Sequence, residues 1–250
     1  MVRDQLLGST QPVLSISLES GESVVGRPGE FAWMTDSIQM TEGPSHEVPD
    51  GSQRVVLSTY CAKGAAGVVA FATRLPGSIL GVDVTPGREY LVHRSAFLAG
   101  TPGIAVSTGF RQPLRTTPDG AGEFVLRHIG GRGRAWVELS GDVVKRDLAG
   151  GTSLRTHPWH IGMCDSSVTV QMAELRAAPS PGVADDAYQF AVLSGPGSVW
   201  LQSLQLPATP SARLTASTSG TIPTAEGPAG QAETRLDSQH AQRHLSRNNR

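Results

Sequence analysis

Apolar and polar residues alternate with a period of about two in several short stretches of the chain. The clearest are 82–84, 136–139 and 168–172. This spacing presents one face of a strand to a core. Proline–glycine pairs follow or precede such stretches, as is typical of turns, at 28–29, 76–77 and 86–87. No segment shows a convincing helical period, so the pattern predicts an all-β protein.

The same strand-turn-strand pattern occurs three times along the chain. Glycines at 21, 87 and 151 occupy corresponding places, at offsets of 66 and 64 residues. Three copies of one unit are the simplest explanation of constant offsets. The sequence therefore predicts modules at 13–78, 79–142 and 143–206. The same offsets relate Arg27, His93 and His157; Phe31, Phe97 and Ile161; and Ala70, Trp136 and Trp200.

A single module of this length would bury too little apolar surface to be stable alone. Three modules around a pseudo-threefold axis would share a core and cover each other's sheet edges. We therefore expect three small β-sandwiches arranged as a triangular prism. The stretches 41–54, 107–123 and 173–187 are expected to be loops at equivalent positions.

Composition separates the ends of the chain from this triplicated domain of 13–206. All aromatic residues lie at or before Trp200, and 207–250 consists mainly of small and polar residues. Such a segment cannot bury enough apolar surface to offset its ordering entropy, so we expect a disordered tail. The alternative is a basic peptide that docks on a partner. Residues 1–12 are expected to be an N-terminal lead-in.

Charge and cysteine content exclude several classes of protein. The chain has 21 Lys and Arg against 22 Asp and Glu, which gives a net charge of −1. Proteins that bind nucleic acid usually have a basic excess, so RNA binding is disfavoured. Two cysteines are too few for a disulfide framework. The sequence shows neither a transmembrane segment nor a signal peptide, so we expect a cytoplasmic protein.

The strongest candidate for a chemical site is the segment His157-Pro-Trp-His160 together with Cys164. These three side chains are competent zinc or iron ligands. On a strand, however, residues three apart point to opposite faces, so the two histidines would not converge. The glycines of 130–134 are expected to form a turn that leads into a strand. No nucleophile elbow or P-loop is present, and we assign no catalytic residue, cofactor or metal.

Three segments, in this order, resemble the altered-inheritance-of-mitochondria family. They are LESGESVVGRPGEFAWMTDSIQM at 18–40, GVDVTPGREYLVHRSAFLA at 81–99 and LSGPGSVWLQSL at 193–204. The resemblance spans about 12–206. It implies a threefold-repeated β-sandwich similar to the tryptophan RNA-binding attenuator protein, in the double-stranded β-helix class. The family's mitochondrial members support inner-membrane organisation and respiratory complexes, and it has no defined catalytic residues.

The leading functional hypothesis is a non-enzymatic scaffold or interaction protein. Its partner would be another protein or a second copy of the chain, with peripheral contact to membrane-bound complexes as a further option. The alternative is an enzyme that binds a small molecule or a metal in a jelly-roll-like pocket near His157, His160 and Cys164. A fold shared with an RNA-binding protein does not transfer that activity.

Overall fold

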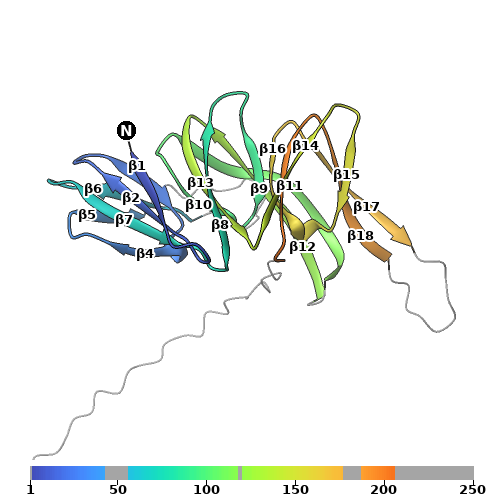
Figure 1. The fold of residues 1–250 in the computed structure, drawn as a ribbon, viewed down its shortest axis with the longest axis horizontal. Coiled ribbons are helices and arrows are strands. Elements are labelled where there is room, and N and C mark those ends of the chain that lie inside the picture. Colours follow the sequence, from blue (N-terminus) through green and yellow to red (C-terminus); the bar gives the residue numbers. More distant parts are fainter. Residues whose placement is uncertain (1, 43–55, 118–119, 177–186, 206–250) are drawn as a thin grey trace, which may run out of the picture. The chain divides into compact units, whose positions relative to one another are not determined.

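The computed structural model describes residues 2–42, 56–117, 120–176 and 187–205 (Figure 1). Strands make up most of these residues, and no α-helix occurs among them. The prediction of an all-β protein is therefore confirmed. Within the same ranges, no helix is long and apolar enough to cross a membrane. The predicted tail, 207–250, lies outside the described residues.

The described chain begins with β1, which is followed by a run of six strands, β2 to β7. A 3-10 turn, η1, separates β3 from β4. The bounds are β1 (Arg3–Leu7), β2 (Val13–Leu18), β3 (Ser23–Gly26), η1 (Pro28–Glu30), β4 (Phe31–Met34), β5 (Ile38–Glu42), β6 (Ser58–Ala62) and β7 (Gly67–Ala72).

Two further runs of six strands follow, and a second 3-10 turn, η2, lies within the last one. The second run is β8 (Gly77–Val84), β9 (Tyr90–His93), β10 (Phe97–Gly100), β11 (Ile104–Thr117), β12 (Gly120–Gly131) and β13 (Gly133–Ser140). The third is β14 (Val143–Leu148), β15 (Ser153–Thr156), η2 (Pro158–His160), β16 (Ile161–Asp165), β17 (Thr169–Arg176), β18 (Ala187–Ser194) and β19 (Gly197–Gln202).

Each run of six strands pairs internally in the same way. In the first run β7 lies between β2 and β4, and β6 lies between β3 and β5. In the second run β13 lies between β8 and β10, and β12 lies between β9 and β11. In the third run β19 lies between β14 and β16, and β18 lies between β15 and β17. This recurrence supports the repeat, while the common axis and the closed prism stay predictions.

Strand pairing also connects each run to the next. β3 pairs with β10 at what we term the first join, and β9 pairs with β16 at the second join. Each join produces a six-stranded sheet, in the orders β5-β6-β3-β10-β13-β8 and β11-β12-β9-β16-β19-β14. The two outer sheets are smaller, with the orders β1-β2-β7-β4 and β15-β18-β17. Among the described strands, none of the first run pairs with one of the third.

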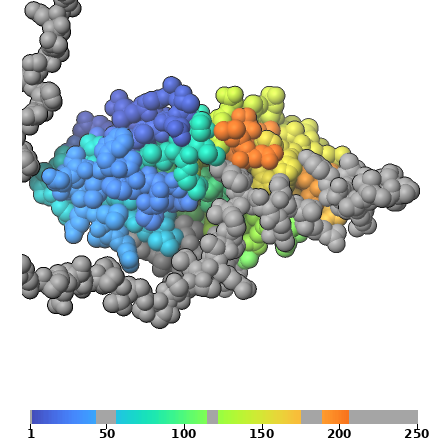
Figure 2. Space-filling model, turned by 90° about the horizontal axis from the view of Figure 1, so that it is seen from below, coloured from blue at the N-terminus to red at the C-terminus, as the bar shows by residue number. Residues whose placement is uncertain are grey.

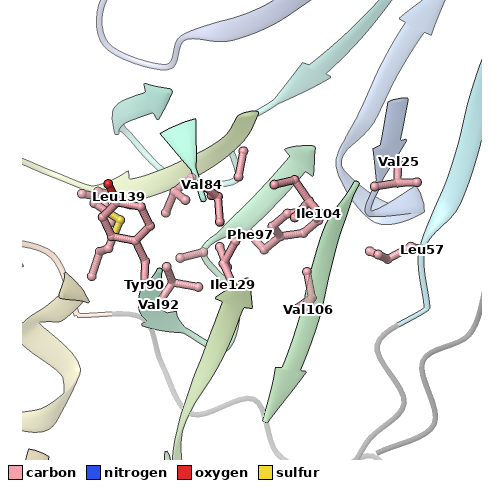
Figure 3. Packing of buried hydrophobic residues seen from close by; sticks show 14 residues of the cluster. Val25, Leu57, Val84, Tyr90, Val92, Phe97, Ile104, Val106, Ile129 and Leu139 are labelled. Atoms are coloured by element: carbon pink, nitrogen blue, oxygen red, sulfur yellow. The ribbon is translucent and has the colours of Figure 1, made fainter. Parts of the chain in front are cut away.

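Three clusters of buried apolar side chains fill the fold. Figure 3 shows the cluster in which Val25 and Leu57 of the first run meet Phe97 and Ile104 of the second. The same cluster includes Met163 of the third run. A second cluster lies mainly in the first run, and a third lies between the long β11–β12 hairpin and the third run. The core therefore continues across both joins.

The structure corrects one prediction about a loop and adds a strand to the N-terminal segment. Most of 107–123 is not a loop, because β11 and β12 pair as one long hairpin. A register shift between Thr108 and Phe110 breaks the period-two pattern and hides this hairpin in the sequence. The segment 1–12 contains β1, which pairs with β2 along its whole length. Of the other predicted loops, 41–54 and 173–187, residues 41–42, 173–176 and 187 lie in strands, and the rest lie outside the described ranges.

Candidate functional site

The structure places His160 at the end of a 3-10 turn and His157 directly before it, and not together on one strand as expected from the sequence. Pro158 begins this turn, since proline cannot donate to a strand ladder. The rings of His157 and His160 lie 6.1 Å apart between centroids. His160 Nδ1 is 2.7 Å from the carbonyl oxygen of Gln202, and the Gln205 amide is 3.0 Å from Nε2. Both ring nitrogens of His160 are therefore engaged within the chain.

The third candidate, Cys164, lies in the apolar core rather than beside the histidines as a ligand. Its side chain belongs to the buried cluster that contains Trp159, Ile161 and Val199. Burial, with a smaller effect from the charge of Asp165, raises the pKa of this thiol to about 12. A buried thiol with a raised pKa is protonated at neutral pH, whereas the thiolate is the form that attacks electrophiles and binds metals. In the described parts of the chain, no group of three or more His, Cys, Asp or Glu could hold a metal ion.

A network of buried charges lies at the first join. Arg74 contacts Glu30 at 3.1 Å and Glu138 at 3.2 Å, and both carboxylates are almost completely buried. Arg27 contacts Glu30 at 3.4 Å and donates to the carbonyl of Ser95 at 2.6 Å. Burial raises the pKa of Glu138 and lowers that of Arg27. Because Arg27 and Arg74 hold Glu30 and also contact Ser95 and Glu138 of the second run, the network fits a structural role.

The best candidate for a binding site is a hollow of about 490 Å³ between the second and third runs. Its walls come from β8, β9, β14, β16 and β19. Trp200 of β19 forms part of the wall, with its ring 6.3 Å from that of Tyr90. Lys145 of β14 lies over the Trp200 ring, 5.3 Å from its centroid. The hollow thus combines an aromatic face with a cation.

One side of the hollow is formed by residues 80–83 of β8. β8 is the last strand of its sheet and pairs only with β13 among the described strands, so its outer edge is open. Leu80 and Val82 of this strand are only partly buried. Their counterparts in β2 by the offset of 66 residues, Leu14 and Ile16, are completely buried. β2 differs from β8 in that its outer edge is paired with β1.

β1 lies along β2 of the first run, and the hollow lies at the corresponding place along β8 of the second run. Asp4 of β1 lies opposite Ile16 of β2. The Asp4 carboxylate accepts a hydrogen bond of 3.0 Å from the indole N–H of Trp136 and contacts Arg134 at 3.5 Å. Trp136 is the counterpart of Trp200 and is completely buried. Figure 2 shows the dark-blue N-terminal segment beside the turquoise residues and the orange residues near 200 on their other side.

A cation accompanies the tryptophan in both places, although it comes from different strands. Arg134 of β13 lies 5.9 Å from the Trp136 ring centroid, whereas Lys145 of β14 lies over Trp200. Ser198 stands where Arg134 would be in the third run. The hollow therefore places a cation, Lys145, beside the tryptophan that corresponds to Trp136.

Each carboxylate that lines the hollow already has an ion-pair or hydrogen-bond partner within the chain. Asp83 pairs with Arg134 at 3.3 Å, and Glu89 lies 3.0 Å from His128. Asp165 accepts a hydrogen bond of 2.7 Å from the backbone N–H of Ser198. Within the described residues, the indole N–H of Trp200 has no hydrogen-bond acceptor. Of the cations that line the hollow, Lys145 pairs with the exposed Asp147 at 3.1 Å, and Arg88 donates to the Tyr90 hydroxyl at 3.0 Å. The indole N–H of Trp200 is therefore the donor that an incoming acceptor would meet, with Lys145 beside it.

The residues of this site were not among the sequence candidates. The correspondence of Trp136 and Trp200 is visible in the sequence, but neither Asp4 nor Lys145 stands out there. The roles of Asp4 and Lys145 follow from their contacts with Trp136 and Trp200, and the contact of Asp4 depends on the pairing of β1 with β2.

Comparison with known proteins agrees with this architecture. The family model described as mitochondrial biogenesis AIM24 matches residues 5–204. The crystal structure of protein SPYM3_0169 from Streptococcus pyogenes superposes with a TM-score of 0.64 and 18% identity, covering 82% of this chain and 94% of that one. At this identity the likeness shows a shared fold only. No functionally curated protein matches the chain. The match over residues 5–204 shows that the chain belongs to the mitochondrial biogenesis AIM24 family.

Proposed function

We propose that the chain is a non-enzymatic, cytoplasmic interaction protein that binds an extended segment of a partner protein in the hollow beside Trp200. The segment adds to the open edge of β8 as a new antiparallel strand, as β1 adds to β2. The observation that carries the proposal is the contrast between Trp136, buried under Asp4 of β1, and Trp200, which faces an open hollow of the same placement.

The chemistry of the hollow specifies the partner segment. Backbone hydrogen bonds to β8 supply affinity without sequence preference, as in other cases of β-augmentation. An apolar side chain opposite the half-buried Leu80 would take the place that Leu6 has opposite Leu14. An aspartate or glutamate aligned with Val82 would accept from the Trp200 indole N–H and pair with Lys145. The expected ligand is therefore a short extended segment with one acidic residue among apolar ones.

The chain itself supplies a probe for this hypothesis. A synthetic peptide with the sequence of residues 2–8 carries the acidic residue in the register of Asp4. Calorimetric titration of this peptide into the full chain should show one saturable site. A peptide with asparagine in place of the aspartate should bind several-fold more weakly, since a partly exposed ion pair contributes about 0.2–1 kcal/mol.

Variants locate the binding site. Trp200→Leu should abolish binding, and Lys145→Gln should reduce the affinity for the acidic peptide but not for its asparagine form. Val144→Ser is the matched control, because Val144 adjoins Lys145 on β14, is exposed and does not line the hollow. Unchanged far-ultraviolet circular dichroism verifies the fold of each variant. Equal binding of the peptide to wild type and to Trp200→Leu would refute the proposal.

A further inference from the structure

Two strands at opposite ends of the chain have open edges. β4 is the last strand of the outer sheet β1-β2-β7-β4, and β15 is the first strand of the outer sheet β15-β18-β17. Neither edge is paired within the described residues. An open edge presents unsatisfied backbone N–H and C=O groups and is a template for another strand.

The chain makes the corresponding pairing twice internally. At the first join Ala99 lies opposite Gly26 and Gly100 opposite Val25. At the second join Met163 lies opposite Val92 and Cys164 opposite Leu91. By the offsets of 66 and 64 residues, these two joins are in the same register. β4 is the counterpart of β10 and β16, and β15 is the counterpart of β3 and β9.

The exposed residues of β4 are those that a third join would cover. Ala99, Met163 and Cys164 are completely buried at the internal joins. Their counterparts on β4 are Trp33, which is 47% exposed, and Met34, which is 37% exposed. Large apolar side chains on an open strand edge are typical of a protein interface.

We propose that β15 of one copy of the chain pairs antiparallel with β4 of a second copy, in the register of the two internal joins. This register places Trp33 opposite Thr156 and Met34 opposite Arg155. The contact is head-to-tail, so the copies at the two ends of an assembly keep an open β4 or β15 edge unless a ring closes. The inference goes beyond the proposed function, since the hollow beside Trp200 lies at the second join and not at these edges.

The His157–His160 turn gains a role in this arrangement. Residues 157 and 160 correspond by the same offsets to Arg27 and Glu30, which lie at the first join. In the assembly the turn would lie beside the new contact, as η1 does beside the first join. The two histidines would thus be interface residues and not metal ligands.

Sedimentation velocity of the full chain over a wide concentration range tests the inference. The weight-average mass should rise above that of one chain as the concentration increases. Trp33→Lys should return the chain to a monomer, whereas Val144→Lys should leave the assembly intact. Val144 is the matched control, because it is 44% exposed and lies on β14, whose counterparts β2 and β8 pair across neither internal join. A monomer at every concentration, or assembly unaffected by Trp33→Lys, would overturn the inference.

Crosslinking tests the register and distinguishes two copies from closure within one chain. In a Cys61→Ser background, Met34→Cys and Arg155→Cys are placed on separate chains, mixed and oxidised with glutathione disulfide. A crosslinked dimer should form with this pair, and markedly less should form when Ser153→Cys replaces Arg155→Cys. Equal yields would overturn the register. A crosslink in the doubly substituted chain without an increase in mass would show closure within one chain and would also overturn the inference.

Discussion

Replacement of Asp4 by alanine should destabilise the fold more than its place near the N-terminus suggests. The Asp4 carboxylate accepts the hydrogen bond of the buried Trp136 indole at 3.0 Å and contacts Arg134 at 3.5 Å. The substitution leaves the indole N–H without its acceptor inside a core cluster. Arg134 keeps its second partner, Asp83, at 3.3 Å.

The hydrogen bond accounts for most of the expected effect. A hydrogen bond to a charged group contributes about 1.5–3 kcal/mol to stability. The Arg134 side chain is 39% exposed, so solvent screening limits its ion pair with Asp4 to less than about 1 kcal/mol. We therefore expect Asp4→Ala to lower the free energy of unfolding by about 2–3 kcal/mol. Asp83→Ala removes only the exposed ion pair and should cost less than about 1 kcal/mol.

Urea unfolding followed by far-ultraviolet circular dichroism measures both values, provided that the denaturant dependence stays constant. Asp4→Asn keeps an acceptor oxygen but not the charge, so its free energy of unfolding should lie between those of wild type and Asp4→Ala. Equal losses for Asp4→Ala and Asp83→Ala would refute the role assigned to the contact between β1 and Trp136.

Two other predictions concern buried titratable groups. Burial, followed by the charges of neighbouring arginines, lowers the pKa of His93 to about 3, whereas the unfolded chain takes up this proton near pH 6.5. The neutral His93 therefore contributes stability above pH 6.5, and this contribution is lost as the pH falls towards 3. His93→Gln should weaken the acid-induced drop in unfolding free energy. An equal drop in the wild type and the variant would contradict this. Cys164, with its pKa raised to about 12, should resist a thiol reagent at neutral pH until the chain is denatured, while the partly exposed Cys61 reacts. Mass spectrometry identifies the modified cysteine, and a Cys164 adduct on the native chain would contradict this prediction.

The regular part of the fold is visible in the sequence because its determinants are local. Alternation within 82–84 and 168–172 and the recurrent glycines indicate strands and their spacing. The β11–β12 hairpin escapes this reasoning, since its register shift at Thr108 interrupts the alternation. β1 escapes it for another reason: all five of its residues are exposed, so no apolar pattern marks the strand.

The candidate sites could not be predicted because they depend on distant residues. His157, His160 and Cys164 are close in sequence, but Pro158 starts a 3-10 turn and Cys164 enters the core. Conversely, Asp4 contacts a tryptophan 132 positions away. Only the strand pairing reveals that Trp136 is covered by β1, whereas Trp200 lines the hollow.

Amide hydrogen exchange of the chain with and without the peptide of residues 2–8 tests the central claim most directly. We expect the outward-facing amides of residues 80–83 in β8 to exchange more slowly when the peptide is bound, because the peptide would pair with this open edge. The same protection should be lost in Trp200→Leu. Unchanged exchange along β8 in the presence of bound peptide would contradict the account.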